Sequence, residues 1–420
     1  MINSGDTAWV LASAALVLFM TPGLAIFYGG MVRAKSALNM MMMSFAAIGI
    51  TTIIWVLYGY SLTFGTSQGG LIGDFGNIGL SGTLDQVVGA EGHQIPTLAF
   101  AMFQLTFAII TVALLSGAIA DRAKYGSWVL FVAAWVTLVY IPVAHWAFAS
   151  QSGSGGWIID KLGALDFAGG TVVEINSGAA ALALAIVLGK RDGFRRDPMR
   201  PHNMPLVLLG AGMLWFGWFG FNAGSALSAG SLAATAMINT QIASAAAAMS
   251  WITFEKFRDG KATTLGVASG AIAGAVVITP ACGYVNPIGA LILGLIAGVA
   301  SSYAVSRKYK FGYDDSLDVV GVHGVSGIVG MIGIGLFATA TVNATGKEGL
   351  FITGSPDLLI KQLIAIVAVA AFSFCATWLI ATVITRTIGF RVPREEELTG
   401  LDTTYHAESA YDITGNSNRY

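Results

Sequence analysis

The 420-residue sequence is short of charge. Only 11% of its residues are Asp, Glu, Lys or Arg, whereas an average soluble domain carries roughly 25%. In their place, 55% of the residues are hydrophobic, and the mean hydropathy is +0.71. The formal net charge of −1 excludes the concentrated basic surface that nucleic-acid binding requires. This composition predicts a polytopic membrane protein that contacts a lipid bilayer and no nucleic acid.

Cysteine and the common catalytic motifs are also scarce. The two cysteines, Cys282 and Cys375, form no CxxC or Cys/His cluster, so neither a disulfide framework nor a metal site is predicted. The sequence contains no Walker, GxSxG or HExxH motif and no TVGYG selectivity filter. We therefore expect no metal, no cofactor and no enzymatic activity.

Long apolar stretches dominate what is there. A membrane-spanning helix needs about 20 mainly apolar residues. Eleven stretches meet this rule, at about 7–31, 40–64, 95–120, 126–149, 167–189, 204–224, 230–253, 263–281, 287–306, 319–340 and 362–385. They predict an all-α membrane domain over residues 1–386, followed by a polar tail over residues 387–420.

The basic residues predict an orientation. Nineteen of the 22 Lys and Arg residues follow odd-numbered stretches or lie in the tail, Arg419 included. Only Lys161, Lys347 and Lys361 fall on the other side. Because positive loops remain in the cytoplasm, we expect the N-terminus outside and the C-terminus in the cytoplasm, which requires an odd number of spans.

A weak internal sequence repeat places two ionisable residues at matching positions. The fifth stretch contains VEINSG (173–178) and the tenth contains VHGVSG (322–327), with Glu174 and His323 in corresponding places. Each follows an aspartate, Asp166 or Asp318, and the two stretches run in opposite directions. Inverted five-helix repeats with a site at the midplane are a common transporter plan. The helical rise puts Glu174 about 12 Å below Asp166 and His323 about 7 Å above Asp318, so we expect the two to meet.

Two readings of this pair stay open. Glu174 and His323 either form a structural contact between helices or mark a transport pathway, which is the usual reason for ionisable groups at membrane depth. Aromatic residues at helical spacing are ordinarily packing or lipid-facing residues. Near an outer mouth with Asp166, however, such rings and a hydroxyl would hold a small cation through cation–π and hydrogen-bond interactions. The candidates for this outer site are Phe103, Phe107, Trp218, Phe221 and Ser225.

Several long motifs in one order resemble the Amt/Mep/Rh ammonium transporters, and most closely the bacterial Amt branch. They are PGLAIFYGGMVRAK (22–35), DFAGGTVVEINSG (166–178), GWFGFNAGSA (217–226), TPACGYV (279–285), DVVGVHGVSGIVG (318–330) and RVPREEELTGLDTTYHAESAY (391–411). The resemblance covers nearly the whole chain. It implies a homotrimer in which each subunit has its own pore through an eleven-helix inverted repeat, that is, two five-helix halves plus an eleventh helix.

The resemblance also implies roles for single residues. By motif position, Trp218 and Ser225 look like outer-site residues, and Phe107 and Phe221 look like a phenylalanine gate. His323 looks like the second pore histidine, and Asp166 like the aspartate below the mouth. These residues are carried over from the matching motifs and not from spacing.

Two residues depart from the family pattern, and the tail follows it. Glu174 replaces the first pore histidine, as in one subgroup of fungal Mep proteins. Phe148 stands where an outer-site tryptophan is usual, so recruitment of a cation should be weaker. Trp146 would substitute only if the helix were shifted. The tail residues Glu397, Gly400 and Asp402 resemble a regulatory segment through which PII-type signalling proteins act.

The function implied is ammonium transport across the plasma membrane for nitrogen uptake. Ammonium would be recruited at the outer site and deprotonated, ammonia would cross the hydrophobic pore, and the proton would move separately, with Glu174 as its relay. The net movement would be electrogenic. Two alternatives share the same pore: an electroneutral ammonia channel, and an ammonium sensor that reports through its tail.

Overall fold

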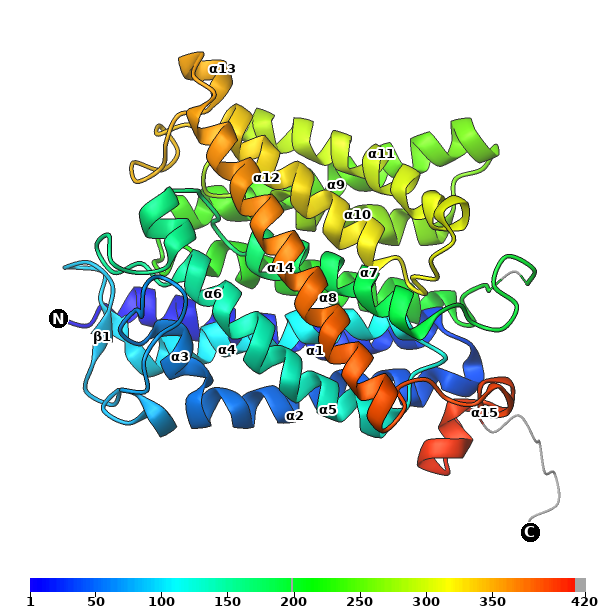
Figure 1. Cartoon of the computed structure of the whole chain (residues 1–420). Coiled ribbons are helices and arrows are strands. Elements are labelled where there is room, and N and C mark those ends of the chain that lie inside the picture. The colour runs from blue at the N-terminus through cyan, green and yellow to red at the C-terminus, as the bar shows by residue number, and fades with distance from the viewer. Residues whose placement is uncertain (198, 412–420) are drawn as a thin grey trace, which may run out of the picture.

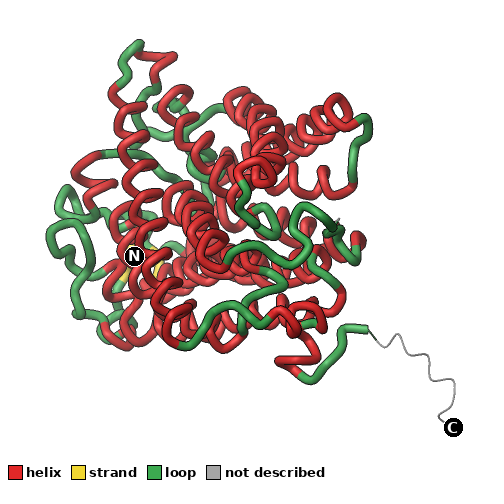
Figure 2. Tube along the Cα trace, turned by 45° about the vertical axis from the view of Figure 1, so that its right-hand side comes forward, coloured by secondary structure: helices red, strands yellow, loops and turns green. Residues whose placement is uncertain are grey.

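The computed structural model describes residues 1–197 and 199–411, and in these ranges helices form nearly all of the regular structure. Figures 1 and 2 show a bundle of long helices in which a single two-stranded hairpin is the exception. The N-terminus and β1 lie at one end of the bundle and α15 at the other (Figure 1). The end of the predicted tail, Arg419 included, lies outside the described residues.

The elements follow one another along the chain with short connections. The helices are α1 (Ser4–Met31), η1 (Ala34–Ser36), α2 (Ala37–Ile54), η2 (Trp55–Gly59), α3 (Tyr60–Phe64), η3 (Ile78–Leu80), α4 (Thr97–Leu115), η4 (Ser116–Ile119), α5 (Tyr125–Trp135), η5 (Val136–Tyr140), α6 (Ile141–Phe148), η6 (Trp157–Leu162), η7 (Gly170–Ile175), α7 (Asn176–Leu188), α8 (Met204–Gly224), α9 (Ser231–Asp259), α10 (Thr264–Ile278), α11 (Pro287–Phe311), η8 (Val320–Gly324), α12 (Val325–Phe337), α13 (Leu350–Thr353), α14 (Asp357–Thr387), α15 (Arg394–Thr399) and η9 (Asp402–His406). The strands β1 (Val87–Val88) and β2 (Ile95–Pro96) pair antiparallel.

Within the described ranges, ten helical segments are long and apolar enough to cross a membrane. Ten of the eleven predicted stretches match these segments. The eighth, at 263–281, is the shorter apolar helix α10, which has 15 residues. Its length of about 23 Å is less than the roughly 30 Å of a hydrocarbon core. Nearly all of its side chains are buried against neighbouring helices.

Two matching units form the centre of the bundle. Each begins as a π-helix, η7 or η8, and continues as a 13-residue α-helix, α7 or α12. The wider π turns shift the helical phase at these points, a feature that often accompanies functional sites. The 31-residue helix α14 crosses diagonally over α7, α5 and α12 (Figure 1).

Candidate functional site

Glu174 and His323 meet in the interior, as the sequence predicts. The carboxylate Oε2 of Glu174 lies 2.8 Å from Nδ1 of His323. Glu174 is fully buried and His323 is 5% exposed. The second carboxylate oxygen, Oε1, has no hydrogen-bond partner among the described residues. The pair can therefore share one proton and still accept a hydrogen bond from a further donor.

Two glycines allow the helices that carry this pair to touch. A Cβ atom built on Gly178 would lie 2.3 Å from the Cα of Gly324. On the same crossing, a Cβ on Gly327 would lie 2.8 Å from the Cβ of Glu174. Glycine at the crossing thus permits the backbone approach that brings the carboxylate and the imidazole together.

Asp166 caps the N-terminal end of η7. Its Oδ1 accepts hydrogen bonds from the backbone N–H groups of Gly169 (2.9 Å) and Gly170 (2.6 Å). Its Oδ2 accepts from the N–H (2.7 Å) and the hydroxyl (2.5 Å) of Thr171. Burial raises the pKa of Asp166, and these hydrogen bonds, which favour the carboxylate, reverse only part of the shift. Asp166 thus fixes the start of the helix that carries Glu174.

Asp315, and not Asp318, is the matching residue in the other half. Asp315 precedes His323 by eight residues, as Asp166 precedes Glu174, and its Oδ2 accepts from the N–H of Val320 at 2.7 Å. Asp318 instead accepts a hydrogen bond from Lys308 Nζ at 2.5 Å. The expectation that Asp318 is the counterpart of Asp166 is therefore wrong. The equal spacing of eight residues is the signal in the sequence that identifies Asp315.

A polar cavity of about 290 Å³ lies on the Asp166 side of the pair. Phe107, Phe148, Asp166 and Ser225 all line it, so four predicted site residues come together there. The Ser225 hydroxyl donates to the carbonyl of Phe221 at 2.8 Å, which leaves its lone pairs available. Further lining residues were not predicted; those with polar groups are Gln104, Tyr284, Asn343 and Thr345.

A pair of stacked rings separates this cavity from the ionisable pair. The rings of Phe107 and Phe221 stack with centroids 4.1 Å apart at 26°. Phe107 lines the polar cavity, whereas Phe221 lines a narrow space of about 10 Å³ that also contacts Glu174 and His323. That volume is close to the minimum for one water molecule. Phe103 lines neither space and packs edge-on against Phe107, with centroids 4.9 Å apart.

Trp218, which the family motif places at the outer site, does not line the polar cavity. It is 2% exposed, donates its indole N–H to Thr279 Oγ1 at 2.9 Å and lines the narrow space beyond Phe221. Trp218 precedes Phe221 by one helical turn, so it lies deeper than the ring that closes the cavity. Trp146 does not line the cavity either: its N–H is bonded to the carbonyl of Leu71.

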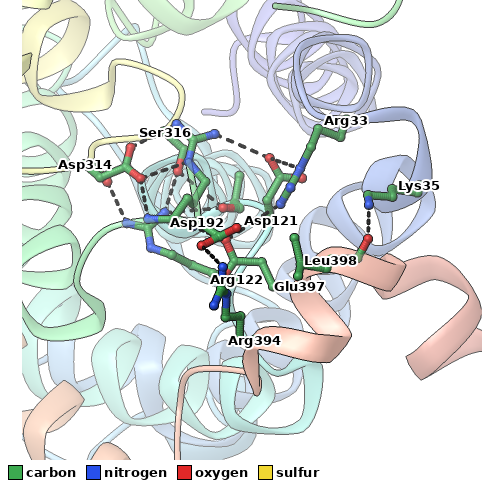
Figure 3. A network of polar contacts seen from close by, with 12 residues as sticks. Arg33, Lys35, Asp121, Arg122, Asp192, Asp314, Ser316, Arg394, Glu397 and Leu398 are labelled. Atoms are coloured by element: carbon green, nitrogen blue, oxygen red, sulfur yellow. Dashed lines mark hydrogen bonds and ion pairs between the residues drawn. The ribbon is translucent and has the colours of Figure 1, made fainter. Parts of the chain in front are cut away.

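The tail residues dock on the end of the bundle opposite the N-terminus. The Asp402 carboxylate accepts from the N–H groups of Leu38 (3.0 Å) and Asn39 (2.8 Å), which belong to the first turn of α2. Gly400 has φ +122°, and a Cβ there would lie 2.7 Å from the Cβ of Lys35. Glycine is therefore required both for the backbone angle and for the close contact. Lys35 in turn donates to the carbonyl of Leu398 (Figure 3).

Glu397 joins the tail to a network of buried charges (Figure 3). Its carboxylate accepts from the N–H of Asp192 at 2.7 Å and from Arg391 at 2.8 Å. Next to it, Arg191 forms a two-point contact with Asp314, at 2.9 and 3.0 Å. Burial alone would raise the pKa of Asp314, but the hydrogen bonds and charge of Arg191 outweigh it and lower the pKa.

This network of charged residues was not predicted from the sequence. Its members are separated by up to 364 positions, from Arg33 to Glu397, and no short motif joins them; besides Arg191 and Asp314 they include Arg33, Asp121 and Arg122. Within the described residues, no group of three or more His, Cys, Asp or Glu side chains could hold a metal ion.

Comparison with known proteins places these features in context. A family model described as the Ammonium Transporter Family matches residues 8–411. An ammonium transporter of Mycobacterium tuberculosis (strain ATCC 25618 / H37Rv) is 51% identical over 434 residues, covering 98% of this chain and 91% of the relative. The crystal structure of Candida albicans Mep2 superposes with a TM-score of 0.85 at 35% identity, covering 94% and 88% of the two chains. A structure described as a sensor Amt protein gives a TM-score of 0.86 at 28% identity, covering 96% and 98%.

Proposed function

The chain belongs to the ammonium transporter family and transports ammonium across a membrane, and we propose that it binds NH4+ in the polar cavity, removes one proton and conducts NH3. The proton crosses separately, so that net charge moves with the substrate. The observation that carries this proposal is the buried Glu174–His323 contact of 2.8 Å behind the stacked rings.

The polar cavity has the chemistry to recruit a small cation. Ammonium has a pKa close to that of a lysine side chain, so nearly all of it is charged at neutral pH. Phe107 and Phe148 provide aromatic faces, Ser225 a hydroxyl, and Asp166 a nearby carboxylate. The two rings attract a cation through their π faces. Because Phe148 lacks an indole N–H, this recruitment should be weaker than with tryptophan.

The stacked rings favour loss of a proton before passage. Moving a bare ion into apolar surroundings costs far more than moving a neutral molecule. Beyond Phe107 and Phe221, the narrow space is lined mainly by apolar side chains. Ammonia can cross this section while it remains hydrogen-bonded to Glu174 and His323. The N–H bond of ammonium breaks at the stacked rings, and the proton passes through a water molecule in the narrow space to the relay pair, where an O–H or N–H bond forms; ammonia is protonated again after release.

A current measurement tests the transport mode. Proteoliposomes on a solid-supported membrane would receive an ammonium pulse, and the internal pH would be followed in parallel. We expect a transient inward current that saturates with ammonium. Uptake of ammonia that changes the internal pH without any current would instead establish an electroneutral channel.

We further propose the arrangement of the chain in its membrane. Helix α10 would be the eighth of eleven spans, with the N-terminus outside and the C-terminus in the cytoplasm of a plasma membrane. Residues 1–386 would form the transport domain and residues 387–420 a regulatory tail. The opposite positions of the N-terminus and α15 support an odd number of spans (Figure 1).

The assembly and its partner are likewise proposals. We propose a homotrimer, and a PII-type protein that acts on the cytoplasmic face through the segment around Glu397, Gly400 and Asp402. The docking of this segment onto α2 and Asp192 supports a coupling to the bundle. Chemical crosslinking of the purified protein and a pull-down with a PII protein would test the two parts separately.

A further inference from the structure

A basic cavity of about 400 Å³ lies where the tail meets the loop that follows α7. It is lined by Lys190, Arg191, Asp192, Gly193, Phe194, Arg196, Arg391 and Arg394. Five of these eight residues are basic and one is acidic. The loop supplies one wall and the tail the other, so the cavity exists only while the tail is docked.

Several of these charges already have partners. Arg191 is buried against Asp314, and Arg391 is bonded to Glu397 at 2.8 Å. Arg394 is largely exposed and approaches Asp192 at 3.2 Å. These residues shape the cavity but contribute little uncompensated charge.

Lys190 and Arg196 supply the surplus of positive charge. Both are exposed, and neither makes an ion pair within residues 1–197 and 199–411. The other acidic residue of this loop, Asp197, lies against Gly193 and does not line the cavity. An anion that enters the cavity therefore meets two cations that no carboxylate neutralises.

A second, mainly apolar cavity of about 280 Å³ adjoins the first. Its lining is Ala185, Ile186, Gly189, Lys190, Phe311, Gly312, Tyr313 and Asp314. Lys190 lines both cavities. The second cavity starts in the last turn of α7, a helix that crosses the membrane, and Ile186 and Phe311 are 50% and 72% exposed. The combined site is thus basic at one end and apolar at the end nearer the membrane.

We propose that the two cavities together bind one anionic phospholipid. Its phosphate would lie between Lys190, Arg196 and Arg394, because guanidinium groups make charge-assisted hydrogen bonds to phosphate. Its glycerol and the start of an acyl chain would lie along Ile186 and Phe311. Anionic lipids are enriched in the cytoplasmic leaflet. That the site faces this leaflet rests on the orientation given under the proposed function.

Binding of the lipid is linked to docking of the tail. Since Arg391 and Arg394 form one wall, a lipid that binds only the complete cavity favours the docked tail by the same factor by which docking favours the lipid. An anionic bilayer would then hold the segment that contains Glu397 and Asp402 in place.

Native mass spectrometry of the full chain in detergent tests the binding. The probes are phosphatidylglycerol, phosphatidylcholine and inorganic phosphate. The double variant Lys190→Gln/Arg196→Gln should bind phosphatidylglycerol about fivefold more weakly for each charge removed. The matched control Lys256→Gln/Lys261→Gln removes two exposed cations outside both cavities and should leave binding unchanged. Equal affinity in the wild type and the double variant would overturn the proposal.

Comparison of the three probes shows whether the site binds an anionic phospholipid or free phosphate. Equal binding of phosphatidylcholine, or displacement of phosphatidylglycerol by millimolar inorganic phosphate, would overturn the phospholipid assignment. A second measurement follows proteolysis of the tail, which phosphatidylglycerol should slow in the wild type and in the control but not in the double variant. Ammonium current from the same preparations separates the two proposals. Lipid binding without any current would refute the proposed transport mode alone, and current with no difference in lipid binding would refute this site alone.

Discussion

Asp166 and Asp315 each lie eight residues before one member of the buried Glu174–His323 pair, yet they are held in different ways. All four hydrogen bonds of Asp166 come from the first turn of η7, and both of its oxygens are used. Asp315 accepts from the backbone of Val320 through Oδ2, and its Oδ1 has no partner among the described residues. Lys308 contacts the carbonyl of Asp315 rather than its carboxylate. In the orientation proposed above, the half with η7 is the outer half and the half with η8 is the inner half. Hydrogen bonds to Asp166 anchor the outer half, and the inner half has, besides the bond to Asp315, the ion pair of Lys308 with Asp318.

The surroundings of the two halves differ in the same direction. The outer half borders an open polar cavity suited to a cation. The inner half borders the charge network of Arg191 and Asp314, to which Glu397 connects the tail. From this we infer that recognition depends on the outer half, whereas regulation reaches the pore through the inner half.

Glu174→Gln should have the largest effect. The amide keeps the shape of the side chain but cannot take up a proton, and proton transfer by a positioned group contributes a factor of roughly 100 or more. We expect ammonium-evoked current to fall by about that factor. Glu174→His should retain current with a changed pH dependence, because imidazole titrates near neutrality. Current per protein across pH 5 to 8 is the measurement, and equal profiles in all three proteins would leave Glu174 a packing residue.

Phe221→Ala should come next. Loss of one ring opens the stack with Phe107 and joins the polar cavity to the narrow space. We expect K+ to pass, so that selectivity for ammonium over K+ falls by roughly tenfold or more as hydration of the pore rises. Currents in ammonium and in K+ solutions give the ratio. Trp218→Phe, which keeps a large ring deeper in the pore, is the matched control, and the same leak in both variants would contradict a barrier at Phe221.

Removal of the residues after Arg391 should act on the inner half. Truncation leaves Arg33 and Arg391 without Glu397 and uncovers the N–H groups that Asp402 caps. We expect transport to fall or lose its regulation by roughly several-fold, since coupling energies are commonly 1–3 kcal/mol, while assembly is retained. Glu397→Gln and Asp402→Asn test the two contacts singly. Wild-type flux in every variant would show that the tail is passive.

The two capping aspartates, Asp166 and Asp315, should differ in how they contribute to the stability of the protein. Asp166→Asn replaces one accepting oxygen with an NH2 group, so two of the four donors lose their acceptor and the free energy of unfolding should fall by roughly 1–3 kcal/mol. Burial, together with the charge of Asp318, raises the pKa of Asp315 to about 6, even though Lys308 acts in the opposite sense. The folded state therefore holds this proton more tightly than the unfolded chain.

The raised pKa of Asp315 determines how the stability of the protein changes with pH. The stabilisation from Asp315 is complete below pH ~4 and is lost as pH rises through about 6. Thermal unfolding in detergent should show this decline in the wild type and a smaller one in Asp315→Asn, in which Asp166 still has a raised pKa. The same decline in Asp315→Asn would assign it to another group.

Phe148→Trp should have the smallest effect on transport, and the effect should come from the outer half alone. An indole face attracts a cation more strongly than phenyl by roughly 0.5–1 kcal/mol. The ammonium concentration at half-maximal current should fall about two- to fivefold. Phe103→Trp is the control because Phe103 lines neither space, and a shift of equal size there would contradict a role of Phe148 in recruitment.

The sequence was enough for the class of protein, for its spans to within a few residues and for the contact between Glu174 and His323. Composition and the 20-residue rule depend on averages over many residues, so single substitutions do not change them. The similarity of VEINSG and VHGVSG is visible because each string is short and continuous in the sequence. The depth of Trp218 was not accessible, because helical spacing gives a shared face but not the position of the ring that closes the cavity. Asp318 was misassigned because it is the aspartate nearer to His323 in the sequence. Which aspartate caps the helix depends instead on where each π-helix begins. The charge network joins loops that are distant in sequence.

The contact between Gly178 and Gly324 sets a rule for how such a pore can vary during evolution. A Cβ on Gly178 would lie 2.3 Å from the Cα of Gly324, so any side chain at residue 178 would push the two backbones apart and separate residues 174 and 323; a Cβ on Gly324 would lie 3.2 Å from the Cα of Gly178, which is a tight contact. The titrating groups, in contrast, lie at the ends of their own side chains, so a different titratable side chain at residue 174 would leave this backbone crossing unchanged. Under the proposed mechanism, selection can thus exchange the proton carrier and retune the pH range of uptake, while the small residues beneath it remain the inherited constraint.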